Sequence, residues 1–236
     1  MSSFAIIIPC YNEAERIQTS AFIAAANANQ NVELYFVNDG STDATQKKLL
    51  EIQYATHRTK IISLHKNSGK GEAIRKGLLA AIQDHHQLVG YLDADLSTGM
   101  EELLRLKDLL SSKDLDIVLG SRIKKIDTVI ERSFFRHITG RMIATLIDQK
   151  FKLGVYDTQC GAKVFRSAVI EHSIQELFYT KWFFDVELLL RIRKNHSHFA
   201  CAEIPLCKWH NVANSKLSIL SFPAVLKDLY VLLNKY

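Results

Sequence analysis

Two aspartates one residue apart, Asp93 and Asp95, follow a short apolar segment, Leu88 to Leu92. Two carboxylates at this spacing can reach one cation if the backbone bends between them, and hard divalent ions such as Mg²⁺ and Mn²⁺ favour oxygen ligands. An isolated pair of this kind is weak evidence, because most exposed carboxylates are simply solvated. Its position at the end of a buried strand, beside other polar strand ends, favours a cation site.

A second polar segment, residues 38–43, places Asp39 next to glycine and hydroxyl residues. Asp39 could accept hydrogen bonds from a nucleobase or ribose, while Thr42 or Asp43 is suited to cap the following helix. Further on, Gly69-Lys70-Gly71 precedes a helical stretch, where backbone N–H groups and the Lys70 ammonium could face a phosphate. The chain lacks the full P-loop pattern and has no GxGxxG after its first strand, which argues against an NAD site.

These polar residues fall between strand-like and helical segments that alternate along the first half of the chain. The expected strands are 4–9, 32–37, 60–64, 88–92 and 115–119, and the expected helices are 12–29, 43–55, 69–84 and 99–111. This alternation with short connections is typical of a doubly wound α/β fold with a mostly parallel sheet. Ligands on such sheets bind beyond the carboxyl ends of the strands, where the polar residues are expected to meet.

The second half of the chain has a different pattern, with longer amphipathic segments. We expect helices at 128–150, 167–177, 182–193 and 216–234, and strands at 162–165 and 199–204. The first of these helices has a basic face, and the last is amphipathic. Because the chain contains no internal repeat and no linker, we expect residues 1–236 to form a single domain.

Composition narrows the class of protein. The chain has 236 residues, a formal charge of +5, 47% hydrophobic and 23% charged residues, with 10 Gly and 3 Pro. This balance excludes collagen-like, low-complexity and disordered chains. The 4 cysteines show no CxxC spacing, which favours reduced thiols in a cytoplasmic protein. We expect no signal peptide, no transmembrane helix and no nucleic-acid partner.

The motifs resemble those of the inverting glycosyltransferases of family 2, which have the GT-A fold. The first half contributes IIIPCYNE (6–13), VNDGSTD (37–43), NSGKGEAIRKG (67–77), YLDADLST (91–98) and GSR (120–122). The second half is similar to the polyprenyl-phosphate glycosyltransferases, above all the dolichyl-phosphate β-glucosyltransferases, through RSFFR (132–136), DTQCGAKVF (157–165), WFFDVELL (182–189), Trp209 and NSKL (214–217). The dolichyl-phosphate mannose synthases resemble the chain less closely, and many of them have an arginine where this chain has His210.

The resemblance implies a nucleotide sugar donor, a divalent cation (Mg²⁺ or Mn²⁺) and a lipid phosphate acceptor. Residues 1–122 would bind the nucleotide and residues 123–236 the acceptor. The residues implied at the nucleotide sugar are Pro9, Tyr11, Glu13, Asp39, Lys70, Asp93, Ala94 and Gln159. Asp93 and Asp95 would hold the metal. The residues implied in transfer are Asp95, Arg122, Asp185, Arg132, Arg136 and Arg141.

Asp185 is the ambiguous carboxylate of this set. It could orient the acceptor as a base would, or it could be the structural partner of an arginine. A lipid phosphate is already anionic and needs little help from a base, so the demand falls on stabilising the leaving diphosphate. Arginine suits this task because its planar fork can bond two oxygens. We expect one in-line displacement at the anomeric carbon, with inversion.

The expected function is transfer of a hexose, most simply glucose from UDP-glucose, to a polyprenyl or dolichyl-type phosphate. A family 2 transferase acting on a saccharide hydroxyl, a mannose synthase-like enzyme using GDP-mannose, a nucleotidyltransferase and a non-catalytic nucleotide-sugar-binding subunit stay open as alternatives. A lipid acceptor requires contact with a bilayer, and basic amphipathic helices can lie at a membrane surface. We therefore expect a cytoplasmic protein, peripheral on the cytoplasmic face of a membrane, with a homodimer as a further possibility.

Overall fold

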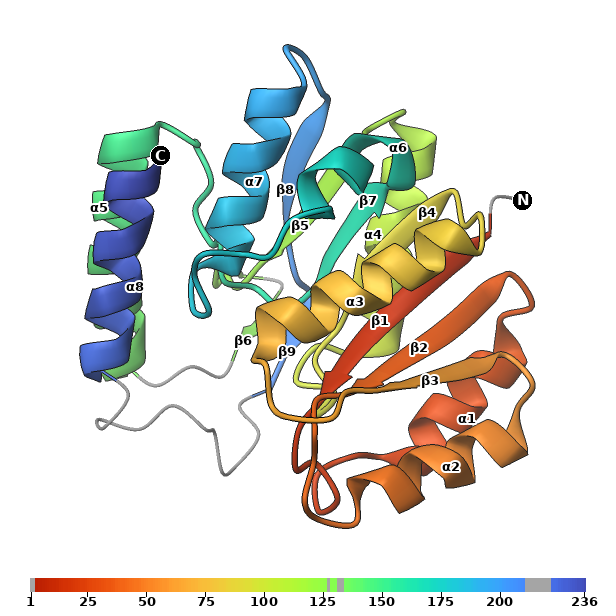
Figure 1. Cartoon of the computed structure of the whole chain (residues 1–236). Coiled ribbons are helices and arrows are strands. Elements are labelled where there is room, and N and C mark those ends of the chain that lie inside the picture. The colour runs from red at the N-terminus through yellow and green to blue at the C-terminus, as the bar shows by residue number, and fades with distance from the viewer. Residues whose placement is uncertain (1–2, 127, 131–133, 211–221) are drawn as a thin grey trace.

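A computed structural model describes residues 3–126, 128–130, 134–210 and 222–236, with the side chains of 134–140 and 222 left out (Figure 1). In this part of the chain a seven-stranded sheet has the order β3-β2-β1-β4-β7-β5-β8. Its strands are β1 (Phe4–Cys10), β2 (Val32–Asn38), β3 (Thr59–Ser63), β4 (Leu88–Tyr91), β5 (Ile117–Ser121), β7 (Lys163–Arg166) and β8 (Cys201–Pro205). Every neighbouring pair is parallel except the two pairs that include β7.

Helices cover both faces of this sheet. They are α1 (Thr19–Ala28), α2 (Thr45–Ala55), α3 (Lys70–Gln83), α4 (Met100–Ser112), α5 (Phe134–Phe151), α6 (Ser167–Ile170), the 3₁₀ helix η1 (Glu171–Ile174), α7 (Phe184–Asn195) and α8 (Phe222–Lys235). A separate parallel pair is formed by β6 (Val129–Ile130) and β9 (Lys208–Trp209).

The core is divided by the sheet, because successive side chains of a strand point to opposite faces. Ile6 and Ile8 of β1 are buried against α1, α2 and α4, whereas Ile7 is buried against α3, α6 and α7. Continuous apolar strands of this kind need cover on both faces. The apolar sequence of strand 4–9 therefore correctly indicated a strand that is buried on both faces.

A third apolar cluster lies outside α7, where α5 and α8 pack side by side (Figure 1). Ile147 and Phe151 of α5 and Leu229 and Leu232 of α8 are buried there. The α8 residue Asp228 ties this layer to the body, since its Oδ2 accepts hydrogen bonds from the N–H groups of residues 181 and 182. The amphipathic C-terminal helices therefore bury part of their apolar stripes within the fold.

One predicted helix in each half of the chain is shorter than expected. The helix expected at 12–29 begins only at Thr19, because Asn12 has a positive φ of 49° and binds the 41–42 loop instead. The segment expected as one helix at 128–150 is divided into β6 and α5. The β6 strand pairs with β9, 79 residues away in sequence by register (Val129 with Lys208), a contact that local periodicity does not predict.

Two further helices of the second half also differ from the prediction. The segment expected as one helix at 167–177 is the short α6 followed by a 3₁₀ turn. The last helix, expected at 216–234, is described from residue 222 onward, and residues 216–221 lie outside the described part of the chain. The strands of the first half and helices α2, α3 and α4 fall within two residues of their predicted bounds.

Candidate active site

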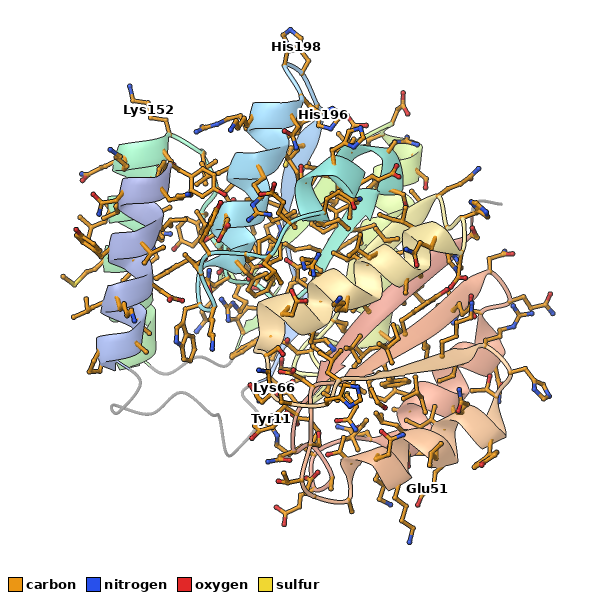
Figure 2. The ribbon with its side chains drawn as sticks, viewed as in Figure 1. Tyr11, Glu51, Lys66, Lys152, His196 and His198 are labelled. Carbon is orange, nitrogen blue, oxygen red and sulfur yellow. The ribbon has the colours of Figure 1, made fainter. Side chains whose placement is uncertain are left out.

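The polar residues of the first half meet at the carboxyl edge of the sheet. The chain passes from β1 outward to β2 and β3 and then returns to β4 on the other side of β1. Such a reversal of strand order leaves a crevice at the strand ends, which is where ligands bind on open α/β sheets. Figure 2 shows Tyr11 and Lys66 at this edge, with Lys152, His196 and His198 at the far end of the molecule.

Asp93 follows β4 directly and lies between a lysine and a glycine. Lys70 Nζ, at the start of α3, is 2.6 Å from Asp93 Oδ1. On the other side the carboxylate lies against Gly161, where an added Cβ would be 2.2 Å from Asp93 Oδ2. Burial acts to raise the pKa of Asp93, but the nearby positive charges, with Lys70 the largest, lower it below its ordinary value.

Asp95 lies at the same edge and contacts the loop after β1. Its Oδ1 accepts a hydrogen bond from the Ser97 N–H at 3.0 Å, and its Oδ2 is 3.5 Å from Arg16 Nη1. Burial and the negative charge of Asp93 raise the pKa of Asp95. Asp93, Asp95, Lys70 and Arg16 are called the edge cluster below.

Arg16 is a member of this cluster that sequence reasoning missed. Its guanidinium makes a two-pronged contact with the Glu13 carboxylate, with Nε 2.8 Å from Oε2 and Nη2 2.6 Å from Oε1. It thereby connects a residue predicted at the nucleoside pocket to a residue predicted at the metal. The spacing of Glu13 and Arg16 was a usable signal, because residues three apart in a single helical turn face each other.

Asp39 is buried and holds the loop that precedes α3. Its two carboxylate oxygens accept hydrogen bonds from the N–H groups of Ser68, at 2.7 Å, and Gly69, at 2.8 Å. Burial raises its pKa, and these two hydrogen bonds oppose that effect. A carboxylate has further acceptor positions, so support of the loop leaves room for the predicted contact with a nucleoside.

The other residues predicted at the nucleotide are spread along the same edge. Pro9 is paired in β1 with Val37, Tyr11 is half-buried, and Ala94 is buried between the two aspartates. Glu13 is buried, and its backbone N–H donates to Thr45 Oγ1 at 2.7 Å. The structure therefore brings the residues predicted in the first half to one edge.

Arg122, which follows β5, is held by a chain of carboxylates. Its Nε and Nη2 bind Asp157 Oδ2 and Oδ1 at 2.7 and 2.8 Å, and its guanidinium lies over the Trp209 ring at 5.6 Å. Glu203 of β8 in turn accepts hydrogen bonds from the N–H groups of Tyr156 and Asp157. A planar guanidinium held by Asp157 and by the Trp209 ring keeps its orientation, which suits it to bind an anion.

Arg141 and Gln159 lie beside Arg122, around a recess of about 50 Å³. Arg141 donates to the Tyr156 carbonyl at 2.6 Å and stacks on the Tyr156 ring at 3.7 Å, while Gln159 is exposed. The recess therefore has two arginines and an amide in its wall. Arg136 belongs to α5 with its side chain outside the described set, and Arg132 lies outside the described residues.

Asp185 lies at the start of α7 in a fully packed environment, with 4% of its side chain exposed. Its Oδ1 accepts hydrogen bonds from the Tyr91 hydroxyl and from Lys163 Nζ, the latter at 2.5 Å. Lys163 is 1% exposed and also donates to the carbonyls of Thr158 and Cys160. Asp185, Lys163 and Tyr91 are called the buried cluster.

The buried cluster bears on the two roles considered for Asp185 and gives the carboxylate a buried cation partner. A structural cation partner exists, and it is a lysine rather than the arginine that was considered. Lys163 was missed because a lysine in a predicted strand reads as a solvent-facing residue. By holding two carbonyls of the 157–160 loop, it also sets the position of Asp157, and hence of Arg122.

The edge cluster can supply part, but not all, of the ligands that a divalent cation needs. Asp93 and Asp95 offer the oxygen donors that Mg²⁺ and Mn²⁺ prefer. The described residues contain no group of three or more His, Cys, Asp or Glu side chains that could hold a metal ion. The two aspartates would therefore share a cation with water and with phosphate oxygens of a ligand, as Mg²⁺ sites commonly do.

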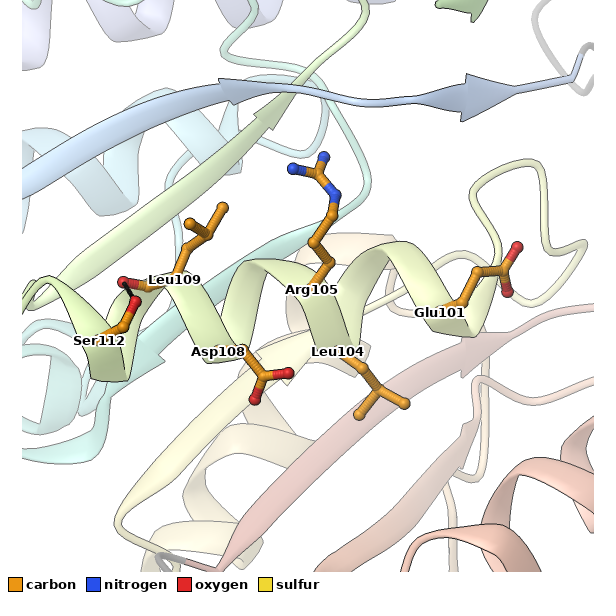
Figure 3. Close-up of a pocket in the computed structure, with 6 residues that line it drawn as sticks. All are labelled: Glu101, Leu104, Arg105, Asp108, Leu109 and Ser112. Carbon is orange, nitrogen blue, oxygen red and sulfur yellow. Dashed lines mark hydrogen bonds between the residues drawn. The ribbon is translucent and has the colours of Figure 1, made fainter.

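A larger open groove, of about 460 Å³, lies away from this edge, along α4 (Figure 3). Its lining comes from a single helix, including Arg105 and Asp108. None of the residues predicted to do chemistry lines this groove. We therefore place the candidate site at the sheet edge.

Comparison with known proteins gives the same picture over most of the chain. The family described as Glycosyl transferase family 2 matches residues 5–173. Dolichyl-phosphate beta-glucosyltransferase of Saccharomyces cerevisiae is 33% identical over 98% of this chain and 74% of its own length. The protein of the same name from Dictyostelium discoideum is 29% identical over 92% of this chain and 69% of its own length.

Solved structures confirm the fold. Glucosyl-3-phosphoglycerate synthase from Mycobacterium tuberculosis, in complex with Mn²⁺, UDP and glucosyl-3-phosphoglycerate, superposes with a TM-score of 0.73 at 17% identity, over 99% of this chain and 79% of its own. S. aureus TarS in complex with UDP gives a TM-score of 0.59 at 18% identity, over 86% and 60%. The mixed α/β sheet has the GT-A architecture.

Proposed function

The chain belongs to glycosyl transferase family 2, and from that premise we propose that it transfers glucose from UDP-glucose to a dolichyl-type lipid phosphate. The observation that carries the proposal is the 33% identity to a dolichyl-phosphate beta-glucosyltransferase over 98% of the chain. That likeness includes the second half, where acceptors would bind. Residues 1–122 would bind the donor and residues 123–236 the acceptor, within one domain.

The donor nucleotide would lie at the β1–β2 side of the edge. Asp39, Glu13 and Tyr11 would face the nucleoside, with Pro9 and Ala94 forming the apolar floor. Lys70, at the N-terminus of α3, would face a phosphate together with the N–H groups of the first turn of that helix. This placement is supported by the shared position of these residues at or beyond the carboxyl ends of neighbouring parallel strands.

Asp93 and Asp95 would hold a divalent cation, Mg²⁺ or Mn²⁺. Such an ion supplies positive charge that stabilises a leaving diphosphate. Burial and the negative charge of Asp93 raise the pKa of Asp95, and a cation beside the pair would offset the repulsion between the two carboxylates. Arg122, fixed by Asp157, would add a second positive charge aimed at phosphate oxygens.

The acceptor phosphate would bind near the recess formed by Arg122, Arg141 and Gln159, with Arg132 and Arg136 as further candidates. A phosphate monoester is anionic at neutral pH, so its oxygen can attack the anomeric carbon without a general base. Burial of Asp185 with Lys163 supports this version of the reaction over transfer to a saccharide hydroxyl, which needs an accessible base. Asp185 would act on the site through its neighbours.

A lipid acceptor places the protein at a membrane surface. None of the described helices is long and apolar enough to cross a membrane. The outer sides of α5 and α8 expose Met142, Leu146, Leu226 and Tyr230, and this apolar area supports peripheral association with the cytoplasmic face. The same area could also serve a homodimer.

The test is sugar transfer from radiolabelled nucleotide sugars to polyprenyl phosphate by purified protein with Mg²⁺ or Mn²⁺. UDP-glucose, UDP-galactose, UDP-GlcNAc and GDP-mannose would be compared in parallel. We expect label in the organic phase with UDP-glucose, lost in Asp95→Ala and kept in the control Asp108→Ala, which changes an exposed aspartate of α4. Nucleotide binding without any lipid product would point to a saccharide acceptor, and product from GDP-mannose to a mannose synthase.

A further inference from the structure

Each carboxylate oxygen of the edge-cluster aspartates already has a neighbour. Asp93 Oδ1 is paired with Lys70 at 2.6 Å, and Asp93 Oδ2 lies against Gly161. Asp95 Oδ1 accepts the Ser97 N–H, and Asp95 Oδ2 faces Arg16 at 3.5 Å. Two single positive charges of the chain itself therefore lie where a divalent cation would have to approach.

Lys70 is far more exposed than Lys163, whereas Arg16, with 16% of its side chain exposed, is held mainly by Glu13. Lys70 has 41% of its side chain exposed, and Arg16 makes a long contact to Asp95 while its main partner is Glu13. Both belong to segments that would also border the donor, one at the start of α3 and one after β1. An arriving diphosphate would offer each of them a new anionic partner.

We propose that Lys70 and Arg16 are built-in counter-ions of Asp93 and Asp95, which they release to the donor diphosphate, so that a divalent cation binds the protein together with the nucleotide. This inference rests on the proposed function of the edge as a donor and metal site. It assigns Arg16 a role in controlling the order of binding.

Charge explains the expected order. In the protein without nucleotide, a divalent cation must compete with two like charges a few ångströms away, and such repulsion is large near a partly buried site. Diphosphate reverses the balance, because it brings negative charge to Lys70, to Arg16 and to the cation. Coupling of this kind is reciprocal, so the cation should tighten nucleotide binding by the same factor.

The experiment measures binding of Mn²⁺ to the full chain by electron paramagnetic resonance, with and without UDP. The variants are Lys70→Gln and Arg16→Gln, and Lys76→Gln is the matched control, an exposed lysine on the same helix. Without UDP we expect weak binding in the wild type and in Lys76→Gln, and about tenfold tighter binding in Lys70→Gln, a modest part of the repulsion between charges at this distance. With UDP we expect binding in the wild type to tighten by about tenfold or more.

Two outcomes would overturn the inference in distinguishable ways. If Mn²⁺ binds Lys70→Gln without UDP no more tightly than it binds the wild type, while UDP still promotes Mn²⁺ binding, the counter-ion role is wrong and the donor site stands. If Mn²⁺ binds none of the proteins with or without UDP, the donor site itself is wrong. Arg16→Gln leaves the buried Glu13 without its main partner, so if circular dichroism shows that it is unfolded, Lys70→Gln alone decides.

Discussion

The edge cluster and the buried cluster have the same chemistry and opposite surroundings. Each pairs an aspartate with a lysine at hydrogen-bond distance, 2.6 Å for Asp93 with Lys70 and 2.5 Å for Asp185 with Lys163. In the first pair the side chains are 32% and 41% exposed, and in the second 4% and 1%. A pair that water reaches can exchange partners, whereas a pair without water is fixed.

This difference in exposure suggests a ligand-binding role for the edge cluster and a structural role for the buried cluster. The edge cluster is better suited than the buried cluster to receive a charged ligand, because Lys70 and Asp93 are partly exposed. Removal of one partner from the buried cluster would lower the free energy of unfolding by several kilocalories per mole, because a buried charge would be left without a partner. It is therefore suited to hold the 157–160 loop, and through Asp157 the Arg122 guanidinium, in one place.

The strongest test of the comparison is Lys163→Met. We expect the free energy of unfolding to fall by about 3–5 kcal/mol, because the buried Asp185 carboxyl group loses its cation partner. Urea denaturation followed by circular dichroism measures this. The control Lys48→Met removes an exposed ion pair with Glu51 and should change stability by less than about 1 kcal/mol. If the two variants lose the same stability, the buried cluster is not the structural support we infer.

The reverse behaviour is expected for Asp93→Asn at the edge. Transfer to lipid phosphate should fall by about 10²-fold or more, as when one group that stabilises developing charge is lost, while the unfolding midpoint in urea stays close to that of the wild type. The substitution keeps the shape of the side chain and removes the charge. A loss of stability equal to that of Lys163→Met, with activity retained in the folded fraction, would contradict the distinction between the two clusters.

The sequence revealed the edge cluster better than the buried one, for a physical reason. Asp93 and Asp95 could be predicted because parallel strands end together, so local strand assignments are enough to bring their neighbours to one edge. Arg16 was within reach, three residues after Glu13, but the predicted helix at 12–29 concealed the loop in which it acts.

The buried cluster depends on contacts that no local pattern contains. Lys163 reaches Asp185 22 residues away, and Tyr91 reaches it across 94 residues. The antiparallel insertion of β7 between β4 and β5, which places Lys163 beside Tyr91 in register, follows from long-range pairing alone. The packing of α5 and α8 on α7 has the same origin. Fold class and the predicted site edge were thus accessible from the sequence, and the supporting contacts were not.

Gly161 lies where the loop held by the buried cluster contacts the edge cluster, so Gly161→Ala tests their connection. The new Cβ would be 2.2 Å from Asp93 Oδ2, and the carboxylate is tied to Lys70 on its other side. We expect a stability loss of about 1–3 kcal/mol, as for other overpacked sites, together with weaker Mn²⁺ binding in the presence of UDP. Urea denaturation measures the change in stability, and electron paramagnetic resonance measures Mn²⁺ binding.

Gly99→Ala is a matched control for that substitution. Its Cβ would be 2.3 Å from Glu101 Oε1, but Glu101 is an exposed, flexible side chain that can turn away. We expect little change in stability or in metal binding. Equal effects in both variants would mean that close approach alone, rather than contact with Asp93, causes the loss.

The smallest expected effect concerns the thiol of Cys160. The backbone carbonyl of this residue accepts a hydrogen bond from Lys163. Burial raises the pKa of Cys160 from 9.0 to about 11. Since the folded protein holds this proton more tightly than the unfolded chain, the thiol leaves stability unchanged below about pH 9 and lowers it as the pH rises from 9 toward 11.

Iodoacetamide labelling at pH 8, mapped by mass spectrometry, measures the same property, because the thiolate is the reactive form. In the wild type Cys160 should react far more slowly than the exposed Cys207. In folded Lys163→Met its labelling should accelerate, since the loop loses the ammonium that holds two of its carbonyls. Labelling of Cys160 at the rate of Cys207 in the wild type would show that the loop opens without any change to the buried cluster, and the contrast between a fixed support and an exchangeable edge would be lost.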